Sequence, residues 1–202
     1  MSGLRRSLPL TLALALPALV AGPVRAAALE TYTIDPVHSK AQFDISHLVV
    51  STVSGKFTQF QGTIHLDPAN LADSSVEVTI DAASVDTGNG MRDKDLRSAN
   101  FFDVAKYPTI TFKSTSVQDL GGGTLQVGGL LTIHGATRPV VIAVSRWATG
   151  PGMKPGTTVA GFRKGTVTIK RSSFGMTYLS AVVGDDVDIT LSVEADRTQA
   201  AP

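Results

Sequence analysis

The chain has 202 residues, of which 43% are hydrophobic and 17% charged, and a formal net charge of +1. The first 28 residues hold three arginines and no acid, so the remainder has 15 basic and 17 acidic residues, a net of −2. No basic patch remains, and we expect no nucleic-acid partner. The absence of cysteine excludes disulfides, a thiol nucleophile and the acylated cysteine of a bacterial lipoprotein.

Residues 1–28 have the pattern of a cleaved secretory signal peptide. Arg5 and Arg6 precede an apolar run from Leu8 to Val20, and small residues follow at 26–28. This run is shorter than the ~20 residues that cross a bilayer as a helix. We therefore expect an exported, soluble periplasmic protein with no integral membrane span and no lipid anchor. The arginine pair leaves both the general secretory and the twin-arginine export routes open.

Most of the remaining chain alternates between apolar and polar residues, which indicates strands with one buried face. Alternation marks residues 41–47, 76–82, 109–113, 140–144, 167–170 and 187–194, and the segments 57–66 and 125–133 also have strand character. Turn residues separate these segments. About eight evenly spaced strands predict an all-β sandwich or barrel. We expect one domain over residues 29–196 and a flexible tail at 197–202.

Residues 91–99 interrupt this pattern with a polar, charged segment that lacks glycine and proline. Asn89 is a suitable helix N-cap. Asp93 and Arg97 stand at i and i+4 in the acid-first order that favours an ion pair. We predict a short helix here, which covers one open end of a barrel with the aromatic pair Phe101–Phe102 behind it.

The sequence holds no motif for catalysis, a cofactor or a metal. The nucleophile, metalloprotease and dinucleotide patterns are absent. The four histidines, His38, His47, His65 and His134, match no metal-ligand spacing. His47 shares a face with Phe43 and Ile45, which is typical of an interior residue. The prediction is therefore a protein that is not an enzyme and has no catalytic residues, cofactor or metal.

A set of short motifs, taken together in chain order, carries a family resemblance. The motifs are Tyr32–Asp35 with His38–Ser39, Phe43, His47, Gly55–Phe57, Phe60, Gly62, Asp93–Ser98, Phe101–Phe102, Tyr107–Pro108, Thr111–Phe112, Ser114, Gly129–Gly135, Arg138–Pro139, Arg171, Phe174–Gly175 and Gly184. From Tyr32 to Ala195 the chain resembles the YceI-like family of polyisoprenoid-binding proteins. Asn100 and Ser173 stand where acids are common in that family.

The resemblance implies a lipocalin-like, up-and-down antiparallel eight-stranded barrel with a short capping helix near 91–99. It also implies periplasmic binding, storage or transport of a long-chain isoprenoid lipid, a polyprenyl compound or a quinone, inside the barrel, and it leaves a homodimer open. The expected tunnel lining is Phe43, Ile45, His47, Phe57, Ile80, Phe102, Phe112, Leu131 and Ile142. Arg97 and Arg171 are candidates for contact with the lipid head group.

Three alternatives stay open at this point. Small barrels also fill their interiors with side chains, so the same residues would form a packed core. A periplasmic enzyme or a stress-related interaction protein acting on an amphiphilic small molecule is the second alternative. The enzyme would need a polar cluster in the cavity, such as His47 with an inward Arg or Asp. An outer-membrane barrel is disfavoured, because strand faces carry Glu77, Asp81, Lys113 and Lys170, which suit water.

Overall fold

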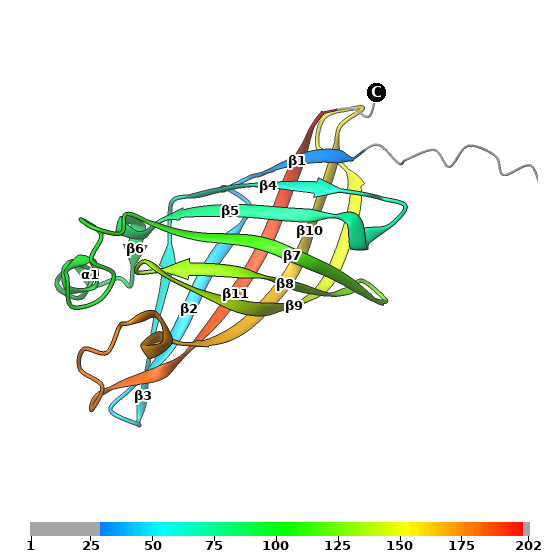
Figure 1. The fold of residues 1–202 in the computed structure, drawn as a ribbon. Helices are drawn as coiled ribbons and strands as arrows, with labels where there is room; N and C mark the ends of the chain where they lie inside the picture. Colours follow the sequence, from blue (N-terminus) through cyan, green and yellow to red (C-terminus); the bar gives the residue numbers. More distant parts are fainter. Residues whose placement is uncertain (1–28, 200–202) are drawn as a thin grey trace, which may run out of the picture.

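The computed structural model describes residues 29–199 and consists of strands with one short α-helix (Figure 1). The strands are β1 (Glu30–Ile34), β2 (Lys40–His47), β3 (Ser51–Phe57), β4 (Phe60–Leu66), β5 (Ser75–Asp81), β6 (Val85–Asp86), β7 (Thr109–Gly121), β8 (Thr124–Ile133), β9 (Ala136–Pro151), β10 (Thr158–Lys170) and β11 (Val183–Gln199). The helix is α1 (Gly90–Arg97), and the 3-10 turns are η1 (Leu71–Asp73), η2 (Ala82–Ser84) and η3 (Arg171–Phe174). No described helix is both long and apolar enough to cross a membrane. The expected signal peptide lies outside the described residues.

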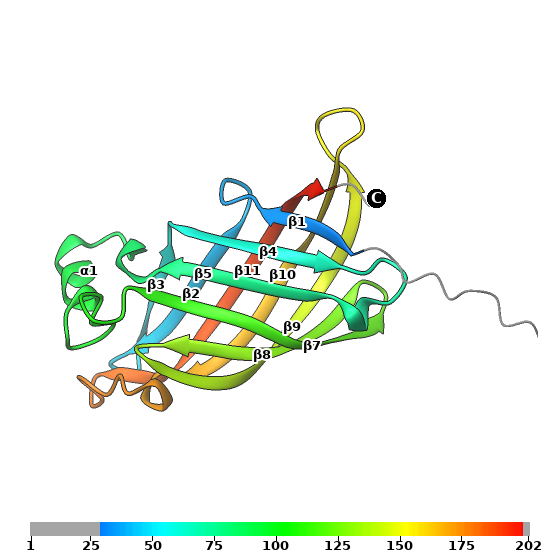
Figure 2. The ribbon, with the colours of Figure 1, turned by 45° about the horizontal axis from the view of Figure 1, so that its top comes forward.

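The strands form one antiparallel sheet that closes into a barrel (Figure 2). One edge of β11 pairs with β10, and the other edge pairs first with β2 and then with β1. β1 and β2 are thus two halves of one barrel strand. β3 with β4 and β5 with β6 are divided in the same way. The prediction of an eight-stranded antiparallel barrel with one short helix is confirmed.

The strand boundaries differ from the predicted ones where the barrel strands are divided. The predicted strand 57–66 is two strands, because β3 ends at Phe57 and β4 begins at Phe60. Residues 51–56 of β3 were not predicted, because small and polar residues there leave Val53 as the one apolar position. β9 and β10 extend well beyond the predicted 140–144 and 167–170, since their ends alternate only weakly.

The predicted flexible tail is wrong for residues 197–199, which belong to β11. Arg197 pairs with Tyr32 across the sheet, and its guanidinium lies 2.9 Å from a carboxylate oxygen of Glu30. The Tyr32 hydroxyl donates to the same carboxylate at 2.6 Å. Burial and this hydrogen bond raise the pKa of Tyr32 to about 12. A buried polar group with satisfied partners therefore fixes this end of the chain.

Asn89 caps α1 as predicted, but the expected Asp93–Arg97 pair does not form. The Asn89 side chain accepts hydrogen bonds from the backbone amides of Met91 and Arg92, each at 3.1 Å. Asp93 is buried and accepts from the amide and the hydroxyl of Thr87. Arg97 donates to backbone carbonyls of the η2–β6 segment. The two side chains therefore do not bind each other, and both attach the helix to the barrel.

Replacing Asn89 by alanine should lower the free energy of unfolding by about 1 kcal/mol, because two amides of the first turn lose their acceptor. Asn89→Gly is the matched control, since glycine at this position typically costs only a few tenths of a kcal/mol. Urea denaturation of the two variants gives the values. Equal loss in both variants would mean that the cap contributes little.

The loop from residue 98 to 108 is held against the hairpin that joins β8 to β9. His134 and Gly135 form the turn, with φ angles of 50° and 74°. Glycine suits the second position because a side chain is strained at positive φ and because the ring of Tyr107 occupies the space of its Cβ. The Tyr107 and His134 rings meet edge to face with centroids 4.7 Å apart. This contact fixes the loop that follows α1 at its end of the barrel.

Candidate functional site: an apolar cavity inside the barrel

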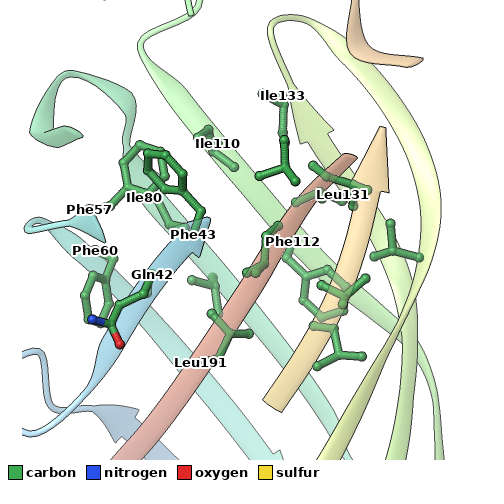
Figure 3. A pocket seen from close by; sticks show the side chains of 18 of the residues that line it. Gln42, Phe43, Phe57, Phe60, Ile80, Ile110, Phe112, Leu131, Ile133 and Leu191 are labelled. Atoms are coloured by element: carbon green, nitrogen blue, oxygen red, sulfur yellow. The ribbon is translucent and has the colours of Figure 1, made fainter. Parts of the chain in front are cut away.

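The barrel interior holds a cavity of about 400 Å³ whose wall is almost entirely apolar (Figure 3). All nine side chains predicted to line a tunnel line this cavity, namely Phe43, Ile45, His47, Phe57, Ile80, Phe102, Phe112, Leu131 and Ile142. Inward positions of β7 to β11 complete the wall. The interior is therefore hollow, which the alternating pattern alone did not distinguish from a filled core.

Three phenylalanines form an aromatic cluster on one side of the cavity. The ring centroids of Phe43 and Phe57 are 5.8 Å apart, and those of Phe57 and Phe102 are 5.7 Å apart. Gly55 faces Phe43 across the β2–β3 pair, and any side chain there would collide with the Phe43 ring. Phe102 comes from the loop after α1, and its backbone amide donates to the carbonyl of Leu96 at 2.9 Å. The glycine and the helix thus set the shape of this wall.

α1 and the loop before β11 border one end of the cavity, here called the mouth. Arg92, Asp95 and Leu96 of α1 line it, together with Met176 and Leu179 from the loop after η3. Figures 1 and 2 show both segments at the same end of the barrel. Phe101 and Tyr178 stack edge to face across this end, with centroids 5.6 Å apart. Arg92 and Asp95 thus place two charged side chains at this end of the cavity wall.

The opposite end of the cavity is closed by large apolar side chains. Leu66, Leu71, Val117 and Trp147 line both this cavity and a second pocket that is more open to solvent. They therefore separate the two spaces. Leu71 belongs to η1, which Asn70 caps by accepting from the amide of Ala72 at 3.3 Å. An apolar ligand that enters at the mouth thus meets a closed apolar end.

The two arginines predicted to meet a head group both bind backbone carbonyls. Arg171 is 4% exposed and borders the cavity. It donates to the carbonyls of Met176, Tyr178, Val183 and Gly184 at 2.7 to 3.0 Å. Burial lowers the pKa of Arg171 from its ordinary value.

Arg97 is not part of the cavity wall. Arg92 and Asp95 reach the wall, although sequence reasoning did not select them. The one available signal was their position in the helix that was predicted to cover one open end of the barrel.

The histidines have separate local environments. His47 faces the cavity, and within residues 29–199 its imidazole makes no hydrogen bond or ion pair. His65 meets the Thr31 hydroxyl, and His134 meets the carbonyl of Phe174. An enzyme would require a polar cluster around His47. The contacts of residues 29–199 include no such cluster.

His38 lies outside the barrel in the β1–β2 turn. Its Nδ1 is 2.6 Å from Oδ2 of Asp35, and Oδ1 of the same carboxylate accepts from the amide of Val37 at 2.8 Å. Glu194 lies nearby, with an oxygen 4.0 Å from the imidazole. The hydrogen bond to Asp35 raises the pKa of His38, and the same bond lowers the pKa of Asp35. The arrangement is that of a charged turn.

The pKa of His38, measured by NMR titration, should lie above its ordinary value of about 6.5. Because the charged pair is stabilised, its contribution to folding holds below the pKa of His38 and disappears as the pH rises through it. It also disappears as the pH falls through the lowered pKa of Asp35. Asp35→Asn should return the His38 value toward 6.5, and Glu194→Gln should change it less. An unchanged titration in Asp35→Asn would rule out the pairing in solution.

Comparison with known proteins gives consistent matches over the whole barrel. The model of the YceI-like domain matches residues 32–195. A UPF0312 protein of Vibrio cholerae serotype O1 is 42% identical over 186 residues, which cover 91% of this chain and 95% of that one.

Two solved structures share the fold. BcnA of Burkholderia cenocepacia is 29% identical, with a TM-score of 0.69 over 80% of this chain and 98% of its own. A polyisoprenoid binding domain from Saccharophagus degradans, implicated in plant cell wall breakdown, is 18% identical, with a TM-score of 0.59 over 82% of this chain and 98% of its own.

Proposed function

The chain belongs to the YceI-like family, and from this membership and the cavity we propose that it is a binding protein for a long-chain isoprenoid lipid. The ligand is a polyprenyl compound or a quinone, and the protein stores or carries it in the periplasm. The observation that carries the proposal is the hollow interior, whose wall is almost entirely hydrocarbon. A lipid chain cannot cross an aqueous compartment unaided, and an enclosed apolar cavity shields it from water.

The energetics of burial favour a hydrocarbon chain as the ligand of the cavity. Burying hydrocarbon contributes about 0.8 kcal/mol per CH₂, so each isoprene unit contributes on the order of 3 kcal/mol before ordering costs. The closed end at Trp147 receives the tail, and the mouth at α1 receives the head group. This orientation places the polar atoms of the ligand beside Arg92 and Asp95, which line the wall at this end.

The arginines along the wall favour a head group of low charge. Arg92 donates through Nε and Nη2 to the hydroxyl and the carbonyl of Thr87, at 2.7 and 2.9 Å. Arg171 donates to four carbonyls. A phosphate would compete with these partners, whereas a quinone or a polyprenol needs few charged contacts. The backbone carbonyls that Arg97 and Arg171 bind give both side chains a structural role, and contact with a head group would come in addition to it.

The comparisons support this proposal to different degrees. The family match supports a binding protein. The Saccharophagus degradans protein is described as a polyisoprenoid binding domain, and at 18% identity it supports the architecture alone. The assignment of an isoprenoid ligand therefore depends on the cavity and on the family.

Loading of the protein with defined lipids tests the proposal. The delipidated protein is incubated with dispersed polyprenol or ubiquinone, passed through a gel-filtration column and extracted. We expect about one long-chain lipid per barrel, as in other ligand-holding small barrels. Phe43→Asp should lose the bound lipid while keeping the fold, because it places a carboxylate in the aromatic cluster. Equal lipid content in a folded Phe43→Asp variant would contradict the assignment of this wall.

A further inference from the structure

Five exposed apolar side chains lie on two neighbouring loops beside the mouth of the cavity and are here called the apolar rim. They are Leu48, Val49 and Val50 in the β2–β3 turn and Tyr178 and Leu179 in the loop before β11. Val49 is 98% exposed and Val50 is 88% exposed. The two loops are joined, because the amide of Leu48 donates to the carbonyl of Val182 at 2.8 Å. Leu179 also lines the cavity, so the rim is continuous with the interior wall.

The backbone of the rim is strained in a way that stability does not explain. Leu48, Val49 and Leu179 have φ angles of 50°, 66° and 53°. Positive φ is unfavourable for side chains with a Cβ and most of all for a β-branched valine, at a cost on the order of 1–3 kcal/mol each. Asparagine and glycine are the residues that hairpin turns of this kind favour. Strained, water-exposed aliphatic residues here indicate a function for their exposure.

Both rim loops are free of charged residues. Residues 45–55 and 172–184 contain no Lys, Arg, Asp or Glu, and His47 and Tyr178 are the titratable side chains among them. Moving such loops into a lipid headgroup layer therefore involves almost no desolvation of charge. The exposed Tyr178 has the amphipathic ring that is enriched at the membrane–water interface.

We propose that the apolar rim inserts into the surface of a lipid bilayer and joins the mouth of the cavity to the membrane. The uncharged rim matches a zwitterionic bilayer and requires neither anionic lipid nor low salt. A protein partner is disfavoured, because five side chains are too few for the ~800 Å² per partner of a standard stable interface. The role of docking in ligand exchange rests on the proposed function, whereas docking itself is measured independently of it.

Flotation with phosphatidylcholine vesicles tests this proposal directly. The wild-type protein should float with the vesicles equally at low salt and at 0.5 M salt. Salt screens attraction between charges, but it does not weaken apolar insertion in this way. Val49→Asp should reduce the bound fraction at least about tenfold, because the variant places a charge at the tip of the rim. The control is Met153→Asp, which adds the same charge at a 96% exposed position in the β9–β10 turn at the other end of the barrel. It should bind like the wild type.

Four outcomes would overturn the proposal. These are no flotation of the wild-type protein, equal loss in both variants, binding that requires anionic lipid and disappears in salt, and a wild-type dimer that Val49→Asp converts to monomer. The last outcome would make the rim an interface between two copies. A protein that contains isoprenoid but does not float contradicts docking alone, whereas one that floats but never takes up lipid contradicts the proposed ligand alone.

Discussion

Replacing Arg171 by alanine is expected to lower the free energy of unfolding by about 3–5 kcal/mol, which is near the upper end for a single substitution. The guanidinium is buried and donates to four backbone carbonyls, of Met176, Tyr178, Val183 and Gly184. Alanine leaves these acceptors without partners inside the protein, at a cost of about 1–3 kcal/mol for each that water does not reach. Chemical denaturation with urea gives the value.

Arg163→Ala provides the control for the loss of an arginine as such. Arg163 is exposed on β10, the same strand that leads into η3 and Arg171. Its replacement should change the free energy of unfolding by no more than about 0.5 kcal/mol, as for most surface positions. A loss below about 1 kcal/mol in Arg171→Ala would contradict the structural role of that side chain and return it to the candidates for head-group contact.

Ile142→Asp should weaken isoprenoid binding by at least about a hundredfold, because a carboxylate facing hydrocarbon costs roughly 3 kcal/mol or more. Ile142 lies on β9 and lines the cavity. The neighbouring Val141 is 56% exposed on the outer face of the same strand. Val141→Asp adds the same charge one residue away, outside the barrel, and should bind the lipid as the wild type does.

The two variants are compared by titration with a polyprenol or a quinone, after circular dichroism has shown that both are folded. Equal binding by the two proteins would mean that the ligand does not occupy the barrel interior. If Ile142→Asp does not fold, Ile142→Trp takes its place, since the larger ring fills part of the cavity without adding a charge. Its affinity should also fall below that of Val141→Trp.

The barrel and its inward face follow from the sequence because a strand alternates strictly. Within each strand the apolar residues mark the inner face, and the period of two then assigns every other position of that strand. The same logic placed Ile80, Phe112, Leu131 and Ile142 on the cavity wall. Recognition of the family added the closure of the sheet into a lipocalin-like barrel, which periodicity does not contain.

Features that depend on contacts between distant segments were predicted less well. The local spacing of Asp93 and Arg97 favoured an ion pair, yet Thr87 and the η2–β6 carbonyls offered each side chain a better partner. The buried environment of Arg171 and the strained turn at Val49 likewise have no local signature. Their geometry depends on how β2, η3 and β11 meet at one end of the barrel.

Native mass spectrometry of the protein purified from its host compartment, followed by organic extraction, tests the central claim most directly. We expect one long-chain isoprenoid per barrel, released when the protein unfolds and identified by its mass. A protein that is ligand-free as isolated, and whose mass stays unchanged after incubation with polyprenyl lipids and quinones, would contradict the claim.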